Sequence, residues 1–159
     1  MNPIPTLRVA VQMLRRHRPS EWEEWRFELD AVMVDDGLFG ASARCVRDDG
    51  RQAHFVHPGL EVALHRDEAE GYHLNLSSGN PVWFVMWRID DDDPSQARPE
   101  LVTLSYNEAG RWLDAQERVD NLPLPAEVRE WLAAYADEHY RPEPKQRRRP
   151  ASFRNPGQR

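Results

Sequence analysis

The sequence has few of the residues that carry disulfide or phosphate chemistry. Its 159 residues include one cysteine, Cys45, so no disulfide can form within the chain. The eight glycines are scattered singly, and no glycine-rich nucleotide motif or serine-elbow motif occurs. These absences argue against a P-loop or dinucleotide-binding protein, and the cysteine content fits a reducing compartment.

Long hydrophobic runs are also missing. The longest apolar run, from Val82 to Trp87, is far shorter than the roughly 20 residues of a membrane-spanning helix. The opening segment lacks the apolar stretch and the small-residue cleavage site of a signal peptide. We therefore expect a cytoplasmic protein without a membrane partner.

Charge is distributed unevenly along the chain. From His139 to the end, seven Arg or Lys residues accompany one acid, a net charge of +6, so residues 1–138 carry −12. An acidic body repels phosphates, so we do not expect the folded part to bind nucleic acid. We predict a single β-rich domain over residues 1–140 with C-terminal helices. Residues 141–159 are predicted to be a disordered basic tail.

Alternation of apolar and polar residues predicts about seven short strands. They cover residues 6–14, 25–34, 54–56, 60–66, 72–76, 81–89 and 101–106. Segments 60–66 and 72–76 are expected to form a hairpin, and Pro58-Gly59 is expected to end the strand before them. Segment 81–89 is apolar on both faces, which indicates a central strand that is covered on both sides.

The last third of the chain changes to a helical period. Ser105 and Glu108 have the spacing of a capping box, which predicts a helix through Trp112 and Leu113. A second helix is predicted by apolar residues at i, i+3, i+4 and i+7, namely Val128, Trp131, Leu132 and Tyr135. The predicted fold is mainly β, a sandwich or partly open barrel closed by two C-terminal helices and followed by the disordered basic tail.

The residues provide weak support for catalysis or metal binding. His54 and His57 have H-x-x-H spacing, with His65 and His73 nearby, but residues three apart on a strand point to opposite faces. Cys45 is either a nucleophile or, as a lone cysteine more commonly is, a small buried apolar residue. We therefore assign no catalytic residue, metal or cofactor, and we lean toward a protein that is not an enzyme.

Three groups of residues are candidates for a binding surface. Trp22 and Trp25 flank the start of a predicted strand, where partial exposure would suit binding. The second group is the turn at the predicted helix start, formed by Ser105, Tyr106, Asn107 and Glu108. The third group is the basic tail, whose Lys145, Arg147, Arg148 and Arg149 have the charge to grip phosphate, RNA or an acidic protein.

Three segments together resemble a bacterial family of about this length known as a domain of unknown function. They are HPGLEVALHRDEAEGYHLNLSSGNPVWFVMWRI (57–89), LVTLSYNEAGRWLDAQERVDNLPLPAEVREWLAAYADEHY (101–140) and RPEPKQRRRPASF (141–153). The opening segment RVAVQMLRRHRPSEWEEWRFELDAVMV (8–34) fits more loosely, and FVMWR and LSYNEAGRW are the most specific pieces. Members of that family are typically encoded beside molybdenum-dependent formate dehydrogenase subunits, and many are labelled molybdopterin-guanine dinucleotide biosynthesis protein A.

Three hypotheses for the function follow, the first two from the resemblance and the third from the charge of the tail. The first is a non-catalytic accessory factor for assembly or molybdenum-cofactor loading of formate dehydrogenase, with a subunit of that enzyme or its maturation proteins as partner. The second, taken from the family label, is an enzyme of molybdopterin-guanine dinucleotide biosynthesis. The third is an RNA- or anion-binding adaptor that acts through the tail. The chain lacks the glycine-rich loop and the strand–helix alternation of a nucleotide transferase, which favours the first hypothesis.

Overall fold

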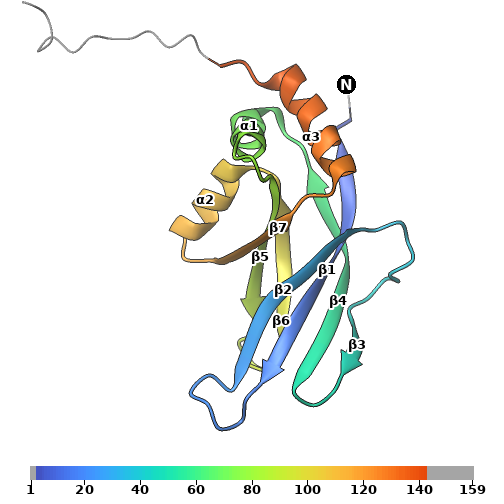
Figure 1. Cartoon of the computed structure of the whole chain (residues 1–159), viewed down its shortest axis with the longest axis vertical. Helices are drawn as coiled ribbons and strands as arrows, with labels where there is room; N and C mark the ends of the chain where they lie inside the picture. The colour runs from blue at the N-terminus through green and yellow to red at the C-terminus, as the bar shows by residue number, and fades with distance from the viewer. Residues whose placement is uncertain (1–2, 143–159) are drawn as a thin grey trace, which may run out of the picture.

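The computed structural model describes residues 3–142, and these contain seven strands in two antiparallel sheets (Figure 1). The four-stranded sheet has the order β2-β1-β4-β3, formed by β1 (Thr6–His17), β2 (Trp25–Val34), β3 (Arg44–Asp48) and β4 (Gln52–Ala63). The three-stranded sheet has the order β6-β5-β7, formed by β5 (Val82–Ile89), β6 (Ala97–Thr103) and β7 (Arg118–Pro123). The predicted mainly β fold of about seven strands is confirmed.

The two sheets face each other and enclose the core. Strand β4 lies next to β6, and β2 lies next to β7, so the sheets approach one another along both sides. Alternate residues of β1 and β5 point inward, as the period of a strand requires. They include Val9, Val11 and Met13 from β1 and Trp83, Val85 and Trp87 from β5. Burial of these large apolar side chains is the main term that favours the fold.

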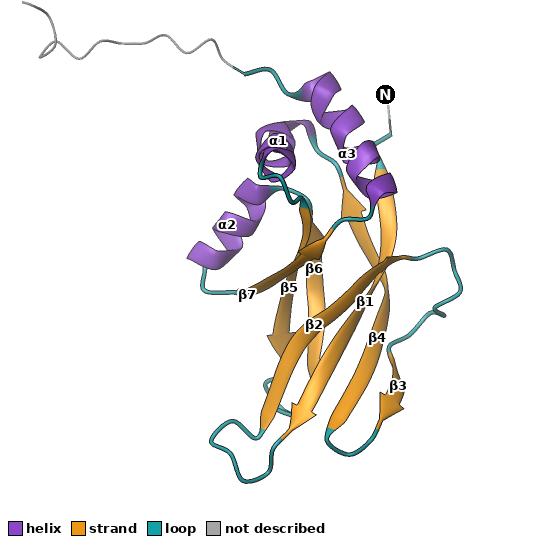
Figure 2. Cartoon of the chain, viewed as in Figure 1, coloured by secondary structure: helices purple, strands orange, loops and turns teal. Residues whose placement is uncertain are grey.

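The helices gather at one end of the sheets, and loops form the opposite end (Figure 2). The helical end consists of the short 3₁₀ helix η1 (Arg66–Glu68) and of α1 (Ala69–Ser77), α2 (Tyr106–Asp114) and α3 (Ala126–His139). Helix α1 packs against both α2 and α3. The loop end contains the β1–β2 loop (18–24), the β3–β4 turn (49–51) and the β5–β6 loop (90–96). The two predicted C-terminal helices correspond to α2 and α3.

The predicted hairpin of 60–66 with 72–76 is wrong, because residues 72–76 belong to helix α1. The alternation of Tyr72, Leu74 and Leu76 indicated a strand, but Leu74 is exposed in the structure. Helix α1 buries Ala69, Gly71, Tyr72 and Asn75, and Ala69, Tyr72 and Asn75 recur every three positions. This is the spacing of a helix that packs one side on its neighbours.

The predicted break at Pro58-Gly59 is also wrong, because β4 continues through it. In the pairing with β1, Val9 lies opposite Leu60 and Val11 lies opposite His57, which leaves two residues of β4 opposite one residue of β1. This is a β-bulge, and Gly59 adopts the positive φ of 80° that bulges often place on glycine. A bulge bends the strand without ending its pairing.

Two strands were missed in the sequence. Strand β3 lies in a stretch without clear alternation, and all five of its residues are exposed. Strand β7 pairs with β5 and ends at Pro123, a residue that marks only a break in the sequence pattern. Neither strand buries a regular apolar face, so the hydrophobic period gave no signal for them.

Candidate functional site

Trp22 is fully exposed on the β1–β2 loop. Pro19 and Ser20 follow the end of β1, and the loop is closed by two backbone hydrogen bonds, from Arg18 N to Glu24 O at 2.8 Å and from Glu21 N to Arg18 O at 3.0 Å. The loop is thus held in shape while the indole projects into solvent. A fully exposed tryptophan has a large apolar surface that a partner can bury.

Trp25 lies three residues after Trp22 in the sequence but is held in a stack of side chains. The His17 ring stacks on its indole with 3.8 Å between ring centroids and 10° between planes. The Arg15 guanidinium lies 4.7 Å from the Trp25 ring and 5.0 Å from the Phe55 ring. Arg15 Nη1 also donates a hydrogen bond to the Ser95 carbonyl at 2.9 Å, which ties the stack to the β5–β6 loop. Trp25 is therefore half-buried and fixed in position, whereas Trp22 projects into solvent.

A groove of about 510 Å³ separates the β1–β2 loop from the β3–β4 turn. Three arginines line it, Arg16, Arg18 and Arg51. Arg16 pairs with Glu28 at 3.0 Å, whereas no ion pair within residues 3–142 holds Arg18 or Arg51. These two guanidinium groups remain available to carboxylates or other anions.

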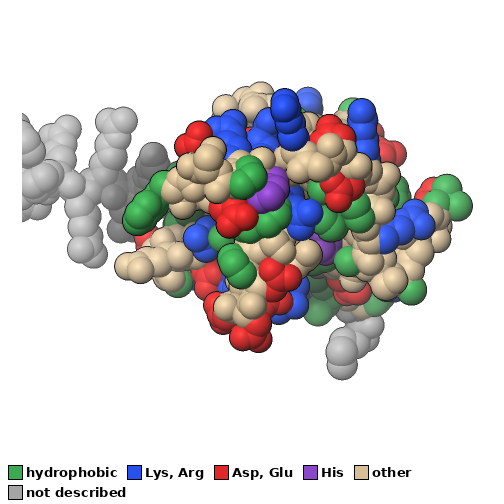
Figure 3. All heavy atoms as spheres, turned by 90° about the horizontal axis from the view of Figure 1, so that it is seen from below, with side chains coloured by type: hydrophobic (Ala, Val, Ile, Leu, Met, Phe, Trp, Pro, Cys, Tyr) green, Lys and Arg blue, Asp and Glu red, His purple; other side chains and the backbone are tan. Residues whose placement is uncertain are grey.

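We call Trp22, Trp25, Arg15, Arg18 and Arg51 the loop-end surface. Figure 3 shows the molecule from this end, with basic side chains gathered along one border and a cluster of acidic side chains on the opposite border. Apolar side chains and histidine lie between them. The face thus combines an exposed tryptophan with charges of both signs, because Glu21 and Glu23 flank Trp22 while Arg18 and Arg51 line the groove.

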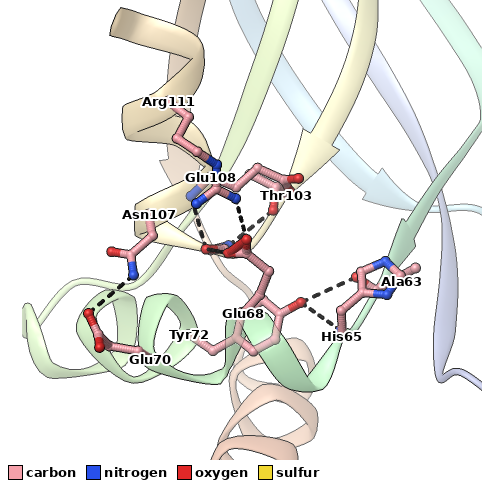
Figure 4. A network of polar contacts seen from close by, with 10 residues as sticks. Ala63, His65, Glu68, Glu70, Tyr72, Thr103, Asn107, Glu108 and Arg111 are labelled. Atoms are coloured by element: carbon pink, nitrogen blue, oxygen red, sulfur yellow. Dashed lines mark hydrogen bonds and ion pairs between the residues drawn. The ribbon is translucent and has the colours of Figure 1, made fainter.

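The predicted turn at Ser105–Glu108 lies at the helical end, where it forms a polar joint between α1 and α2 (Figure 4). The buried Ser105 hydroxyl accepts from Glu108 N at 3.1 Å, as the predicted helix cap requires. The same hydroxyl donates to the Glu68 carboxylate at 2.5 Å, and Arg111 also donates to Glu68. The hydrogen bond to Glu68 raises the pKa of Arg111.

The other side chains of this joint also have their partners within the protein. Asn107 Nδ2 donates to Glu70 Oε1 at 3.3 Å, and the ring of Tyr106 packs edge-on against Phe84. Tyr72 Oη accepts from His65 N at 2.9 Å and donates to the Ala63 carbonyl at 3.4 Å, and burial raises the pKa of this phenol. Since these groups bind one another, the arrangement supports a structural role for the turn.

The structure thus separates the residues that the sequence singled out. Trp22 and Trp25 lie at the loop end, and Ser105, Tyr106, Asn107 and Glu108 lie at the helical end. Lys145, Arg147, Arg148 and Arg149 lie outside the described residues. The sequence analysis missed Arg15, which contacts Trp25, and Arg51, whose carbonyl accepts from His17 N. It also missed Glu68, which the fold brings to Ser105.

The histidines and the cysteine occupy separate places. Within residues 3–142, no group of three or more His, Cys, Asp or Glu side chains is positioned to hold a metal ion. His54 contacts Asp30 Oδ2 at 3.0 Å, His73 stacks on Tyr140, and His57 is partly buried on β4. The expectation of a buried Cys45 is wrong, because its side chain is exposed on β3.

In the described part of the chain, no helix is both long and apolar enough to cross a membrane. No curated protein and no solved structure matches the chain. One family model, described as a protein of unknown function (DUF3305), matches residues 8–149. The resemblance to a family of unknown function is therefore confirmed, and the chain belongs to the DUF3305 family.

Proposed function

We propose that this protein is a non-catalytic accessory factor that binds a partner protein through the loop-end surface. The full exposure of Trp22 is the observation that carries the proposal. Tryptophan and arginine are the residues that most often dominate the binding energy of protein interfaces. Here both kinds occur together, on a loop whose backbone is already closed by hydrogen bonds.

The surface is organised for binding before a partner arrives. Trp25 is immobilised by His17 and Arg15, so little side-chain entropy remains to be lost at that position. Trp22 supplies a side chain for a partner's pocket, and truncation of such an anchor typically costs about 2 kcal/mol or more of binding energy. Arg18 and Arg51 add attraction for acidic groups that enter the groove, whereas Glu21 and Glu23 repel acidic groups directly beside Trp22.

The partner we propose is formate dehydrogenase or one of its maturation proteins, with assembly or molybdenum-cofactor loading as the process served. The support for this partner is the sequence resemblance, through the family's typical gene neighbours. The surface chemistry adds a requirement: the contact face of the partner should offer an apolar pocket for Trp22, with carboxylates placed toward the groove that Arg18 and Arg51 line.

The experiment is a pull-down of the tagged full-length chain from its host grown on formate, read by mass spectrometry. Wild type is compared with Trp22→Ala and with Leu113→Ala, which removes an exposed apolar side chain at the helical end. We expect formate dehydrogenase subunits with wild type and Leu113→Ala, and a loss of roughly tenfold or more with Trp22→Ala. Equal recovery with Trp22→Ala, or no recovery of these subunits with any variant, would contradict the proposal.

A calorimetric titration with GTP separates the accessory role from the biosynthetic one. An enzyme that joins GTP to molybdopterin must bind the nucleotide, so saturable GTP binding would favour that alternative. The RNA- or anion-binding adaptor is checked by deletion of residues 141–159. Salt-sensitive RNA binding that vanishes with this deletion would favour it, whereas RNA binding that persists would exclude the tail as its site.

A further inference from the structure

Strand β3 leaves one edge of the four-stranded sheet open. It is the last strand in the order β2-β1-β4-β3, so β4 pairs with one of its edges, and no strand within residues 3–142 pairs with the other. All five residues of β3 are exposed, including the apolar Val46 at 48%. An edge of this kind presents backbone donors and acceptors to which another strand can pair.

Two arginines of β3 lie on the same face of the sheet. In the strand register, Arg44 lies opposite Val56 and Arg47 lies opposite His54. Val56 and His54 in turn oppose Gln12 and Leu14, whose side chains share the outer face of β1 because they are two residues apart. The register shift at Val46 is what brings Arg44 and Arg47 to one face.

Neither arginine forms an ion pair within the described part of the chain, although the charge of Arg47 acts on nearby Asp49. The ion pairs found in residues 3–142 involve other cations, so Arg44 and Arg47 present two positive charges along the open edge. The opposite face of β3 carries Cys45 and Asp48, since these residues oppose Phe55 and Ala53. One face of the edge is thus basic, and the other carries the apolar Cys45 and the acidic Asp48.

This charge pattern discriminates between occupants. A second copy of the chain would bring its own Arg44 and Arg47 to the shared edge, and like charges on neighbouring strands destabilise their pairing. An acidic strand would instead place carboxylates beside both arginines. The residues between those acids would lie on the face of Asp48, so they should be uncharged to avoid repulsion by its carboxylate.

We propose that β3 receives an extended acidic segment of a partner protein, which adds a fifth strand to the sheet. Backbone hydrogen bonds to β3 hold the segment, and its alternate carboxylates pair with Arg44 and Arg47. The segment recognised therefore carries acidic residues at every second position, with uncharged residues between them. This interface goes beyond the proposed function, because it lies on β3 and does not involve Trp22.

The test is a titration of the ¹⁵N-labelled full-length protein with a seven-residue peptide that alternates glutamate and valine. We expect shifted resonances and slowed amide exchange at residues 44–48. Charge reversal in an Arg44→Glu/Arg47→Glu variant should weaken binding by about tenfold or more, as for loss of close charge pairs at other interfaces. An Arg66→Glu/Arg129→Glu variant, with the same change of net charge on exposed residues elsewhere, should retain the affinity.

Four results would overturn the proposal. The first is equal affinity for the Arg44→Glu/Arg47→Glu variant, and the second is equal binding of a peptide with a central proline, which cannot form the backbone ladder. The third is single-stranded RNA of the same charge binding at β3 as tightly as the peptide. If the arginines only prevent self-association, an Arg44→Val/Arg47→Val variant will dimerise while the wild type binds no peptide, and this result also overturns it. Since Trp22→Ala leaves β3 intact, failure here and failure of the proposed function are distinguishable.

Discussion

The two ends of the molecule use polar and aromatic residues in opposite ways. At the helical end, Asn75 and Ser105 are buried, and their polar atoms are bound to other groups of the protein. At the loop end, Trp22 is fully exposed, and Arg18 and Arg51 have no ion-pair partner in the described residues. The comparison indicates that the polar groups of the helical end stabilise the fold, whereas the loop end leaves Trp22 exposed, as the proposed binding role requires.

Substitution of Asn75, at the helical end, should cause the largest loss of stability. Its side chain donates to the carbonyls of Val82 and Leu104 at 2.8 and 2.9 Å and accepts from Val82 N at 3.0 Å. Asn75→Ala leaves three buried backbone groups without these partners, so we expect a loss of about 3 kcal/mol or more in the free energy of unfolding. Urea unfolding measures this, with the exposed Asn121→Ala as control. A loss below about 1 kcal/mol would contradict the assigned role.

Gly71 should rank second, because α1 approaches α2 closely at this position. A Cβ on Gly71 would lie 2.0 Å from Ser105 Oγ and 3.2 Å from the Asn107 backbone nitrogen. Gly71→Ala forces the two helices apart and should cost about 2–3 kcal/mol of stability. Gly110→Ala in α2 is the matched control, since its Cβ meets no atom within 4 Å. It should be neutral or stabilising by up to about 1 kcal/mol, and an equal loss in both variants would refute the packing explanation.

His57 lies between the two ends and makes stability depend on pH. Burial, aided by the charge of Arg98, lowers the pKa of His57 below its usual 6.5. Its buried Nε2 has no hydrogen-bond partner in the described structure. The folded state thus favours the neutral ring, so this contribution is fully present above pH 6.5 and is lost as the pH falls toward the lower folded pKa.

Urea unfolding between about pH 5 and pH 8, the range in which histidine titrates, checks this prediction. Wild type should lose stability on the acid side, and His57→Gln should show a weaker pH dependence. The exposed His73→Gln should keep the profile of the wild type. An unchanged slope for His57→Gln would assign the pH dependence to another group.

Trp22 should show the smallest effect on stability. Because its side chain makes no buried contact, we expect Trp22→Ala to change the free energy of unfolding by less than about 0.5 kcal/mol. Trp25→Ala, which removes the stack on His17 and Arg15, should destabilise more. Urea unfolding followed by circular dichroism compares the two, and equal destabilisation would remove the distinction between the projecting and the fixed tryptophan.

Several elements could be predicted because their pattern depends on one local period. Segment 81–89 is apolar on both faces, and β5 is the central strand of its sheet. The S-x-x-E spacing places the cap of α2 at Ser105, and the predicted face of α3 is buried at Val128, Leu132 and Tyr135. Segment 72–76 was misassigned because Tyr72 and Leu76 suit either a strand face or adjacent turns of a helix.

The candidate sites were only partly visible in the sequence. Trp22 and Trp25 stand out as aromatic residues in a charged stretch, but nothing local indicates which of them projects into solvent. Arg51 joins them through pairing of His17 with the β3–β4 turn, more than thirty residues along the chain. The open edge at β3 depends on strand order, which no short-range pattern reports.

The sequence by itself determined the mainly β class, the central position of β5 and the two C-terminal helices, because hydrophobic period and helix capping act over a few neighbouring residues. The tertiary structure alone decided that residues 69–77 form a helix, that Ser105 meets Glu68, and that Arg44 and Arg47 share one face. These outcomes depend on contacts between distant segments and on a one-residue shift in register. Such a shift moves side chains to the other face of a sheet without any change in composition.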